Sequence, residues 1–268
     1  MDILLYILIL LLAGAITGFL SGLLGVGGGF IMTPIQYFLL VHIGVEANLA
    51  ITISFATSLG IILITSIFSS RKHYANNFVV KKNIKFLIVS GFFGALSGAL
   101  LSVHLDVNIL QLIFAILCIG AGIWMFIIKY PENSELIASE KYKYILLGLC
   151  AGLLSGLLGV GGGIILIPIF CLVLKYPVHK AIGTSSTIII FTSCGGLLMY
   201  LILGLYTSNL PDYCFGYINI LQLIFISLTS CIFAKYGADT AKKTKPIILK
   251  YLHIILMLFI GLKMGGLF

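Results

Sequence analysis

Two copies of one glycine-rich string hold the backbone groups best suited to bind a small ligand. The string Leu-Ser-Gly-Leu-Leu-Gly-Val-Gly-Gly-Gly occupies residues 20–29 and recurs unchanged at residues 154–163. A helix that restarts after such a string presents unpaired N–H groups and the positive end of its dipole, and glycine lets an anion approach that backbone closely. Each string therefore predicts an anion-binding loop, and the candidate residues are Gly25, Gly27, Gly28, Gly29, Gly159, Gly161, Gly162 and Gly163.

A different role for these glycines is to permit tight crossing of helices, as small residues often do in membranes. Five glycines within eight residues, present twice, favour the ligand-facing loop over this alternative. A Thr-Ser pair follows each loop, Thr57 and Ser58 in the first half and Thr184 and Ser185 in the second. Their hydroxyls can donate to an oxyanion, or they can bind carbonyls of their own or a neighbouring helix, and both possibilities stay open.

Other kinds of chemistry are poorly represented in the sequence. Its acidic residues Glu46, Asp106 and Asp212 fall at expected external turns, so no buried carboxylate relay is visible. Six cysteines form no CxxC pair and have no histidine at ligand spacing, which predicts neither a disulfide nor a metal site. The glycine loop lacks the flanking strand and the following acidic residue of a dinucleotide site. We therefore expect no catalytic residues, no cofactor and no metal.

The elements that must position the loops belong to a duplicated chain. The two strings are offset by 134 residues, half of the 268-residue chain, and Pro34 and Pro168 follow them at the same distance. A polar segment separates the copies, so we expect a first membrane repeat at residues 1–130, a polar cytoplasmic linker at 131–143 and a second membrane repeat at 144–268.

Composition indicates that both repeats lie in a membrane. Hydrophobic residues make up 60% of the chain and charged residues 9%, whereas about a quarter of the residues of a soluble domain carry charge. The long charge-free stretches predict helices, because a bilayer leaves backbone groups to be paired internally and no alternating strand pattern is present. The basic residues behind the net charge of +8 lie between these stretches, where positive charge sets the orientation in the membrane, so the charge predicts no nucleic-acid partner.

The distribution of lysine and arginine decides how the glycine loops are arranged. One helix over residues 3–41 would be about 58 Å long, roughly twice the hydrocarbon core, so it must break at the glycines. If the chain turns back there as a hairpin, fifteen of its sixteen Lys and Arg residues fall on one side. We therefore expect an all-α membrane protein with two inverted repeats, eight full-length spans, two half-helices at residues 30–41 and 164–174, and both termini outside.

Three histidines fall near the expected ends of spans. His73 and His104 are expected at loop edges, and His253 near the start of the last span. Each is expected to be an interfacial residue rather than a ligand.

The doubled glycine motif with its following proline resembles the signature of the TauE/SafE sulfite exporter family, also called the TSUP permeases. The stretch ATSLGIILITSIFSSRKHYANNFV at residues 56–79 and the Gly183-Thr184-Ser185 triplet resemble it too. Here His73 is followed by Tyr74 rather than by the family's usual glycine, so the family pattern does not carry over to that loop. The resemblance covers essentially the whole chain.

This resemblance implies a multi-pass permease of the bacterial cytoplasmic membrane that exports small sulfur-containing anions such as sulfite, thiosulfate or organosulfonates. It also implies that the glycine loops and Thr-Ser pairs line the path, and that the protein is not an enzyme. Two alternatives stay open, a passive anion channel and a non-transporting membrane assembly component. The partners expected are the anion and the lipid bilayer, and the sequence leaves the oligomeric state, the coupling ion and the exact substrate undetermined.

The inverted arrangement makes a testable prediction about topology. Reporter domains fused after Tyr74 and after Phe268 are expected on opposite sides of the membrane, the first inside and the second outside, because the basic loops stay inside. Paired assays with a reporter active only in the cytoplasm and one active only outside it measure this. Both fusion points on one side would contradict the hairpin arrangement.

Overall fold

The structure is a computed structural model that describes residues 3–25, 28–127, 140–208 and 210–266. Within these residues the first half contains five helices: α1 (Ile3–Leu24), α2 (Gly29–His42), α3 (Ala47–Ala75), α4 (Ile84–Ser102) and α5 (Val107–Ile127). The second half contains α6 (Lys141–Leu158), α7 (Gly163–Leu172), α8 (Val178–Leu205), α9 (Ile220–Lys243) and α10 (Pro246–Met264). Eight of these described helices are long and apolar enough to cross a membrane, and α2 and α7 are shorter, so the predicted all-helical class is confirmed.

The structure differs from the sequence-based prediction in two connections. A short antiparallel hairpin of β1 (Cys214–Phe215) and β2 (Ile218–Asn219) joins α8 to α9, where only helices were expected. The helix α6 begins at Lys141, inside the predicted linker, and residues 131–139 of that linker lie outside the described residues. The repeat boundaries and the origin of the halves by duplication therefore stay predictions.

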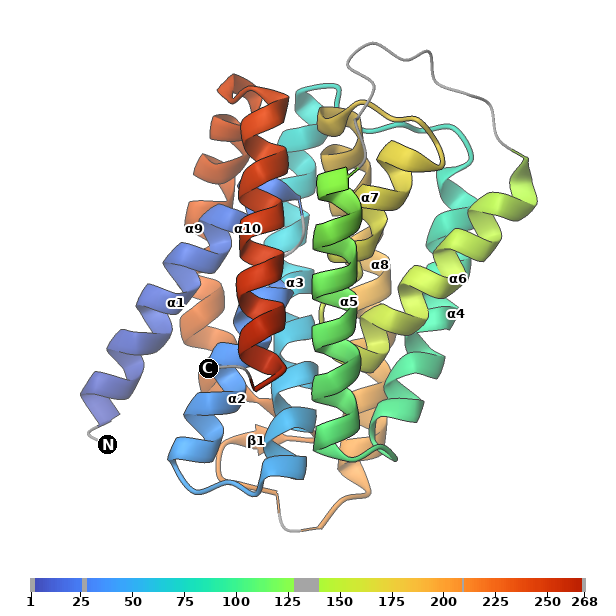
Figure 1. Ribbon diagram of the computed structural model, residues 1–268. Coiled ribbons are helices and arrows are strands. Elements are labelled where there is room, and N and C mark those ends of the chain that lie inside the picture. Colours follow the sequence, from blue (N-terminus) through green and yellow to red (C-terminus); the bar gives the residue numbers. More distant parts are fainter. Residues whose placement is uncertain (1–2, 26–27, 128–139, 209, 267–268) are drawn as a thin grey trace.

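Equivalent helices of the two halves run in opposite directions in Figure 1. The helix α1 rises from the N-terminus and α2 returns downward, whereas α6 descends and α7 returns upward. The connections after α3, α7 and α9 consequently lie at the upper edge, and both termini lie in the lower half (Figure 1). We call the upper edge the basic face, because these connections and the helix turns beside them carry most of the lysines: Lys81, Lys82, Lys85, Lys175, Lys180, Lys242, Lys243 and Lys245.

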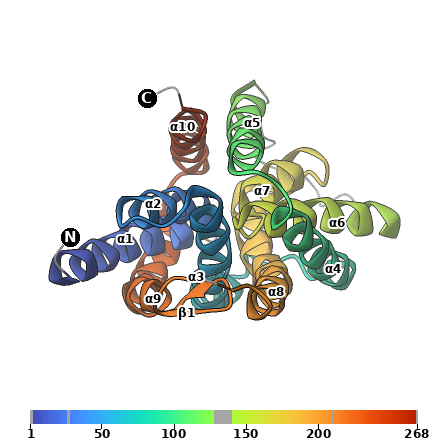
Figure 2. The same ribbon diagram turned by 90° about the horizontal axis from the view of Figure 1, so that it is seen from below.

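Helices pack in pairs that repeat across the two halves. The helix α1 packs on α9 and α6 packs on α4, while α3 lies against α8 and α5 against α10. Seen from below, α2, α3 and α7 lie between α8 and α9 at the lower edge and α5 and α10 at the upper edge, with α1 on the left and α4 and α6 on the right (Figure 2). The short helices and their glycine turns therefore lie within the body of the protein, where they can meet.

Glycines allow the α1–α9 and α6–α4 pairs to come into backbone contact. A Cβ atom at Gly22 of α1 would lie 2.0 Å from the carbonyl oxygen of Ala234, and one at Gly156 of α6 would lie 2.0 Å from that of Ala95. No side chain fits at such distances, so these helices are held by direct packing of their backbones. The alternative role of glycine, tight crossing of helices, therefore holds for the helix that precedes each loop.

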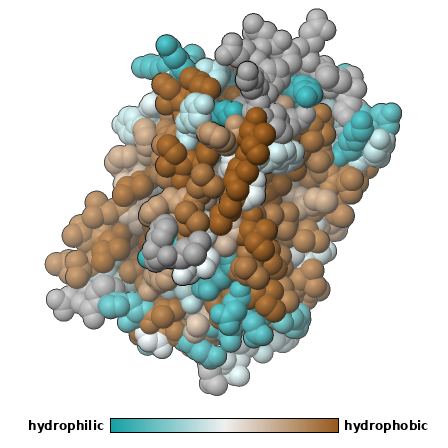
Figure 3. Space-filling view, viewed as in Figure 1, coloured by the Kyte–Doolittle hydropathy of each residue, from teal (hydrophilic) through white to brown (hydrophobic). Residues whose placement is uncertain are grey.

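The outer surface is apolar over most of its height. Figure 3 shows hydrophobic residues across the middle of the visible face, with hydrophilic ones gathered toward its upper and lower ends. Large apolar side chains point outward on the peripheral helices; Ile116 and Phe126 of α5, for example, are 60% and 63% exposed. A soluble monomer rarely exposes such a continuous apolar surface, and contact with lipid accounts for it.

The close packing at Gly156 leads to a stability prediction. Gly156→Ala is expected to lower the midpoint of thermal unfolding in detergent by about 5 °C, because overpacking a helix contact costs about 1–3 kcal/mol. Gly120→Ala is the matched control, since a Cβ atom at Gly120 of α5 would meet nothing within 4 Å. Equal midpoints of thermal unfolding for the two variants would show that the α6–α4 contact accommodates a methyl group without loss of stability.

Candidate functional site

The two glycine turns have the same backbone conformation. Gly25 and Gly159 have φ values of 67° and 63°, and Gly28 and Gly162 have φ values of 75° and 84°. These left-handed conformations strain any residue with a Cβ atom, which explains why glycine stands at the matched positions. The chain then enters α2 at Gly29 and α7 at Gly163, each one residue before the predicted start of its half-helix, and α7 ends at Leu172, two residues before the predicted end. Of the candidate glycines, Gly27 lies outside the described residues.

The two turns meet in the middle of the protein. A Cβ atom built on Gly29 would lie 3.0 Å from the Cα atom of Val160, which belongs to the second turn. Ile62 of α3 lies against both turns: its side chain would be 2.2 Å from a Cβ at Gly29 and 2.9 Å from one at Gly161. The tertiary structure thus brings together two strings that are half a chain apart.

The first residues of α2 and α7 surround this meeting point. The carbonyl of Gly28 accepts hydrogen bonds from Ile31 and Met32, and the carbonyl of Gly162 accepts the equivalent bonds from Ile165 and Leu166. The amides at the very start of each helix have no partner within their own helix, and they carry the positive end of its dipole. Since α2 and α7 run away from the meeting point in opposite directions (Figure 1), two positive helix ends face the same region. This arrangement can stabilise an anion without a cationic side chain.

The candidate serines hold the glycine turn of the opposite half. The hydroxyl of Ser185 on α8 donates to the carbonyl of Gly25 at 2.9 Å, and the hydroxyl of Ser58 on α3 donates to that of Gly159. Each serine also bonds the carbonyl three residues earlier in its own helix. Both serines are fully buried, so their bonds supply partners to turn carbonyls that water cannot reach. In this conformation they position the turns.

The candidate threonines hydrogen-bond other segments of the backbone. Thr57 accepts from the amide of Asn219 at 2.9 Å, and Thr184 accepts from the amide of Val80 at 3.0 Å. Asn219 and Val80 precede α9 and α4, so each threonine anchors the start of a spanning helix in the opposite half. The structure therefore separates the two residues of each pair: the serines reach the glycine turns, whereas the described bonds of the threonines lie away from them.

Several polar residues beside the turns were missed by the sequence analysis. Thr192 of α8 donates to the carbonyl of Gly161 at 2.8 Å, and Thr33 of α2 lies 3.2 Å from the hydroxyl of Ser58. Ser193 would be 3.2 Å from a Cβ at Gly161. The sequence contains a pattern that could have identified Thr192 and Ser193. A second Thr-Ser pair follows the first at the same interval in each half, at residues 65–66 and 192–193.

Two histidines are not interfacial, and that prediction was wrong. His73 lies in the last turn of α3 with no exposed surface, and its Nε2 is 3.0 Å from the carbonyl oxygen of Gly22. His253 of α10 is 2% exposed and stacks on Phe30, the second residue of α2, with ring centroids 6.1 Å apart. A position near a helix end does not determine burial, because neighbouring helices cover these ends. His104 is exposed in the turn after α4, as expected.

The site is closed in this conformation. A cavity of about 10 Å³ lies beside Val160 and Gly162 and is lined otherwise by apolar residues and Cys118. A second space beside Gly28, which also touches Thr17, Thr65 and Ser230, holds no room for a water molecule. Water needs at least about 10–15 Å³, so neither space can admit a hydrated anion until helices move.

Comparison with known proteins identifies relatives along the whole chain. The profile of the sulfite exporter TauE/SafE family matches residues 10–264. A probable membrane transporter protein of Methanocaldococcus jannaschii is 33% identical over 97% of this chain and 94% of its own length. A probable membrane transporter protein of Haemophilus influenzae is 27% identical over 97% of this chain and 98% of its own. An Arabidopsis thaliana protein named sulfite exporter TauE/SafE family protein 5 is 29% identical over 41% of this chain and 24% of its own. No solved structure matches the chain.

The bond from Ser185 to the opposite turn can be tested against its neighbour. Ser185→Ala is expected to lower the free energy of unfolding by about 1–3 kcal/mol, since it leaves the buried carbonyl of Gly25 without this donor. Ser186→Ala is the matched control, because Ser186 is also buried and, among the described residues, its hydroxyl donates to Ile182 of its own helix. Thermal unfolding of both purified variants measures the difference, and an equal loss would argue against the cross-half bond.

Proposed function

The chain belongs to the sulfite exporter TauE/SafE family of membrane transporters, and we propose that it exports a small sulfur-containing oxyanion such as sulfite, thiosulfate or an organosulfonate. The observation that carries the proposal is the contact between Gly29 and Val160, which brings the starts of α2 and α7 to one point. The candidate binding groups are the first amides of these helices and the hydroxyls beside them.

The chemistry of this region favours an anion over a cation. Two positive helix ends converge there, and the nearby side chains of Ser58, Thr33 and Thr192 are hydroxyls that can turn their O–H bonds toward an oxyanion. Among the described residues no carboxylate lies near the meeting point: Asp239 pairs with Lys72 at the exposed end of α9, and the other four occupy connections at the helix ends, Glu46, Asp106, Glu140 and Asp212. A cation would therefore find no charge partner at this depth.

The closed centre favours a carrier over a permanently open pore. Ile62 fills the space between the turns, so an anion can reach the helix ends only after α3 moves relative to α2 and α7. Helices broken at matching positions in opposed halves are typical of secondary transporters, in which one bundle rocks against another around a central site. On this proposal the basic face is cytoplasmic, in the inner membrane of a bacterial cell, and its lysines attract the anion to be exported.

A passive channel that uses the same groups is the second candidate function. The two differ in their kinetics: a carrier gives flux that saturates with anion concentration and shows counterflow, whereas a channel gives conductance that does not saturate in this way. The contact of Ile62 with both turns is the observation that favours the carrier.

Flux measurements on the central glycine test the function. Reconstituted protein is expected to move sulfite, thiosulfate or a sulfonate with saturation, and Gly161→Leu is expected to reduce that flux to less than about a tenth, because its side chain would fill the site. Gly44→Leu is the matched control, since Gly44 also has a positive φ of 93° but meets nothing within 4 Å.

Retention of both variants in the membrane is checked by quantitative blotting and gel filtration. Wild-type flux in Gly161→Leu would contradict the proposed site. Absence of flux for every sulfur anion in the unmodified protein would contradict the substrate class.

A further inference from the structure

Four buried polar side chains in or beside the first glycine string have unused hydrogen-bonding atoms. The hydroxyls of Ser21 on α1 and of Ser66 and Ser69 on α3 have no hydrogen-bond partner among the described residues, and neither has Nδ1 of His73. Each of these residues is at most 1% exposed. Buried polar groups are almost always paired, so this concentration of unpaired ones needs a physical explanation.

Three of these side chains lie along one face of α3, and the His73 end of that face meets α1. Ile62, Ser66, Ser69 and His73 recur at helical spacing, so they project from the same side of α3. At one end of this row Ile62 contacts Gly29, and at the other His73 bonds the carbonyl of Gly22 on α1. The two serines therefore lie on α3 beside the first glycine string, between its contact with Ile62 and its contact with His73.

The third wall of this region is α9. Thr65 of α3 and Ser230 of α9 share a hydrogen bond of 2.9 Å, and both line the small space beside Gly28 together with Thr17. A Cβ atom at Gly28 would also lie 3.3 Å from that of Ser21. Hydroxyl groups from three helices thus continue directly from the first glycine turn. We call the set of Ser21, Ser66, Ser69 and His73 the polar row.

The second half has only part of an equivalent row: Ser155 and Ser193 match Ser21 and Ser66, are likewise buried, and their hydroxyls have no hydrogen-bond partner among the described residues. At the positions of α8 that match Ser69 and His73 stand Gly196 and Tyr200, and the Tyr200 hydroxyl already donates to the carbonyl of Gly156 at 2.9 Å. The unpaired hydroxyl of Ser69 and the ring of His73 are therefore the members of the polar row that are particular to the first half.

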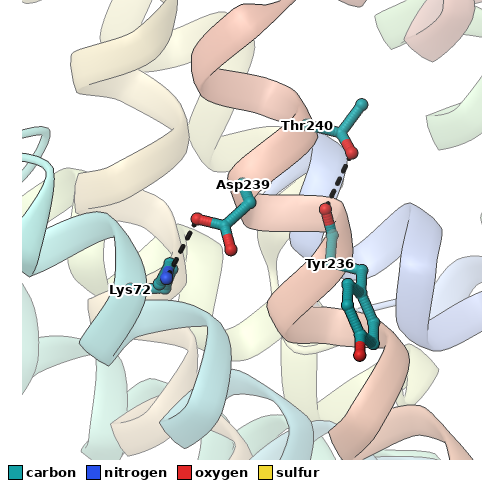
Figure 4. A network of polar contacts seen from close by, with 4 residues as sticks. All are labelled: Lys72, Tyr236, Asp239 and Thr240. Carbon is teal, nitrogen blue, oxygen red and sulfur yellow. Dashed lines mark hydrogen bonds and ion pairs between the residues drawn. The ribbon is translucent and has the colours of Figure 1, made fainter.

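An exposed ion pair joins two of the three helices at the basic face. Lys72 of α3 lies 3.0 Å from Asp239 of α9, and their side chains are 41% and 47% exposed (Figure 4). Lys72 precedes His73 directly, so parting this pair frees the end of α3 that carries the polar row. Exposed ion pairs add little stability, which suits a contact that must open repeatedly.

We propose that the space between α1, α3 and α9 is the route of the transported anion between the glycine turns and the basic face. The hydroxyls of Ser21, Ser66 and Ser69 donate to the anion when the helices part, and the Lys72–Asp239 pair keeps the route shut in the present conformation. His73 supplies an acceptor: its Nε2 must donate to the Gly22 carbonyl, so Nδ1 of the neutral ring carries a lone pair for water or for a protonated oxyanion. The identity of the migrating anion rests on the proposed function.

Accessibility of an introduced thiol tests the route. All six cysteines are first replaced by alanine, and Ser69→Cys or Ser66→Cys is added to that background in sealed vesicles of known orientation. A membrane-impermeant anionic methanethiosulfonate is expected to modify either thiol from the basic face only. The Asp239→Asn substitution, which removes the ion pair, is expected to raise the rate by about 1.5- to fivefold. Ser54→Cys is the matched control: Ser54 is also fully buried on α3 but bonds Ala50 of its own helix, and its thiol is expected to stay unmodified.

The outcomes separate the route from the substrate. No modification of Ser66→Cys or Ser69→Cys, with or without Asp239→Asn, in variants that elute as folded protein would overturn the route. Equal rates from both faces, or equal modification of Ser54→Cys, would overturn it as well. Sulfite flux is measured on the same vesicles of the cysteine-free background. Modification from the basic face without sulfite flux supports the route and counts against the proposed substrate class. Sulfite flux without modification supports the substrate class and counts against the route.

Discussion

The structure depends on how backbone groups are paired where two membrane helices break. A bilayer provides no water to the carbonyls and amides at a break, so protein groups must pair with them. Here the partners come from the other half: Ser185 bonds the carbonyl of Gly25, and Ser58 bonds that of Gly159. Each broken helix is therefore completed only when both halves are assembled, and this requirement draws the two turns together at the centre.

Close packing of the helices before each turn is a second constraint. The glycines of α1 and α6 remove the side chains that would separate α1 from α9 and α6 from α4. Left-handed glycines such as Gly28 and Gly162 then turn the chain into α2 and α7. Glycine thus has two functions in one string, close packing before the turn and a left-handed backbone within it.

The central region contains both well-bonded glycine turns and, beside them, polar side chains without partners in the described part of the chain. The turns are well bonded, whereas Ser66 and Ser69 on the α3 face beside them have no partner among the described residues. Such unpaired groups destabilise the closed form, and a protein retains them when they form hydrogen bonds in another conformation. We therefore expect the hydrogen-bonded turns to stay together and the α3 face with the unpaired hydroxyls to move.

The sequence by itself determined the helical class, the two short helices and the matched glycine turns, because hydrophobic length and backbone conformation are local properties. It also identified Ser58 and Ser185 as candidates but not their partners, since a hydroxyl bonds whatever acceptor the fold brings to it. Only the tertiary structure decided that Thr57 lies away from the turns, that His73 is buried, and that Gly29 meets Val160. Those facts depend on which helices become neighbours, and in a chain this uniformly apolar many pairings bury similar surface, so close glycine contacts and cross-half hydrogen bonds select among them.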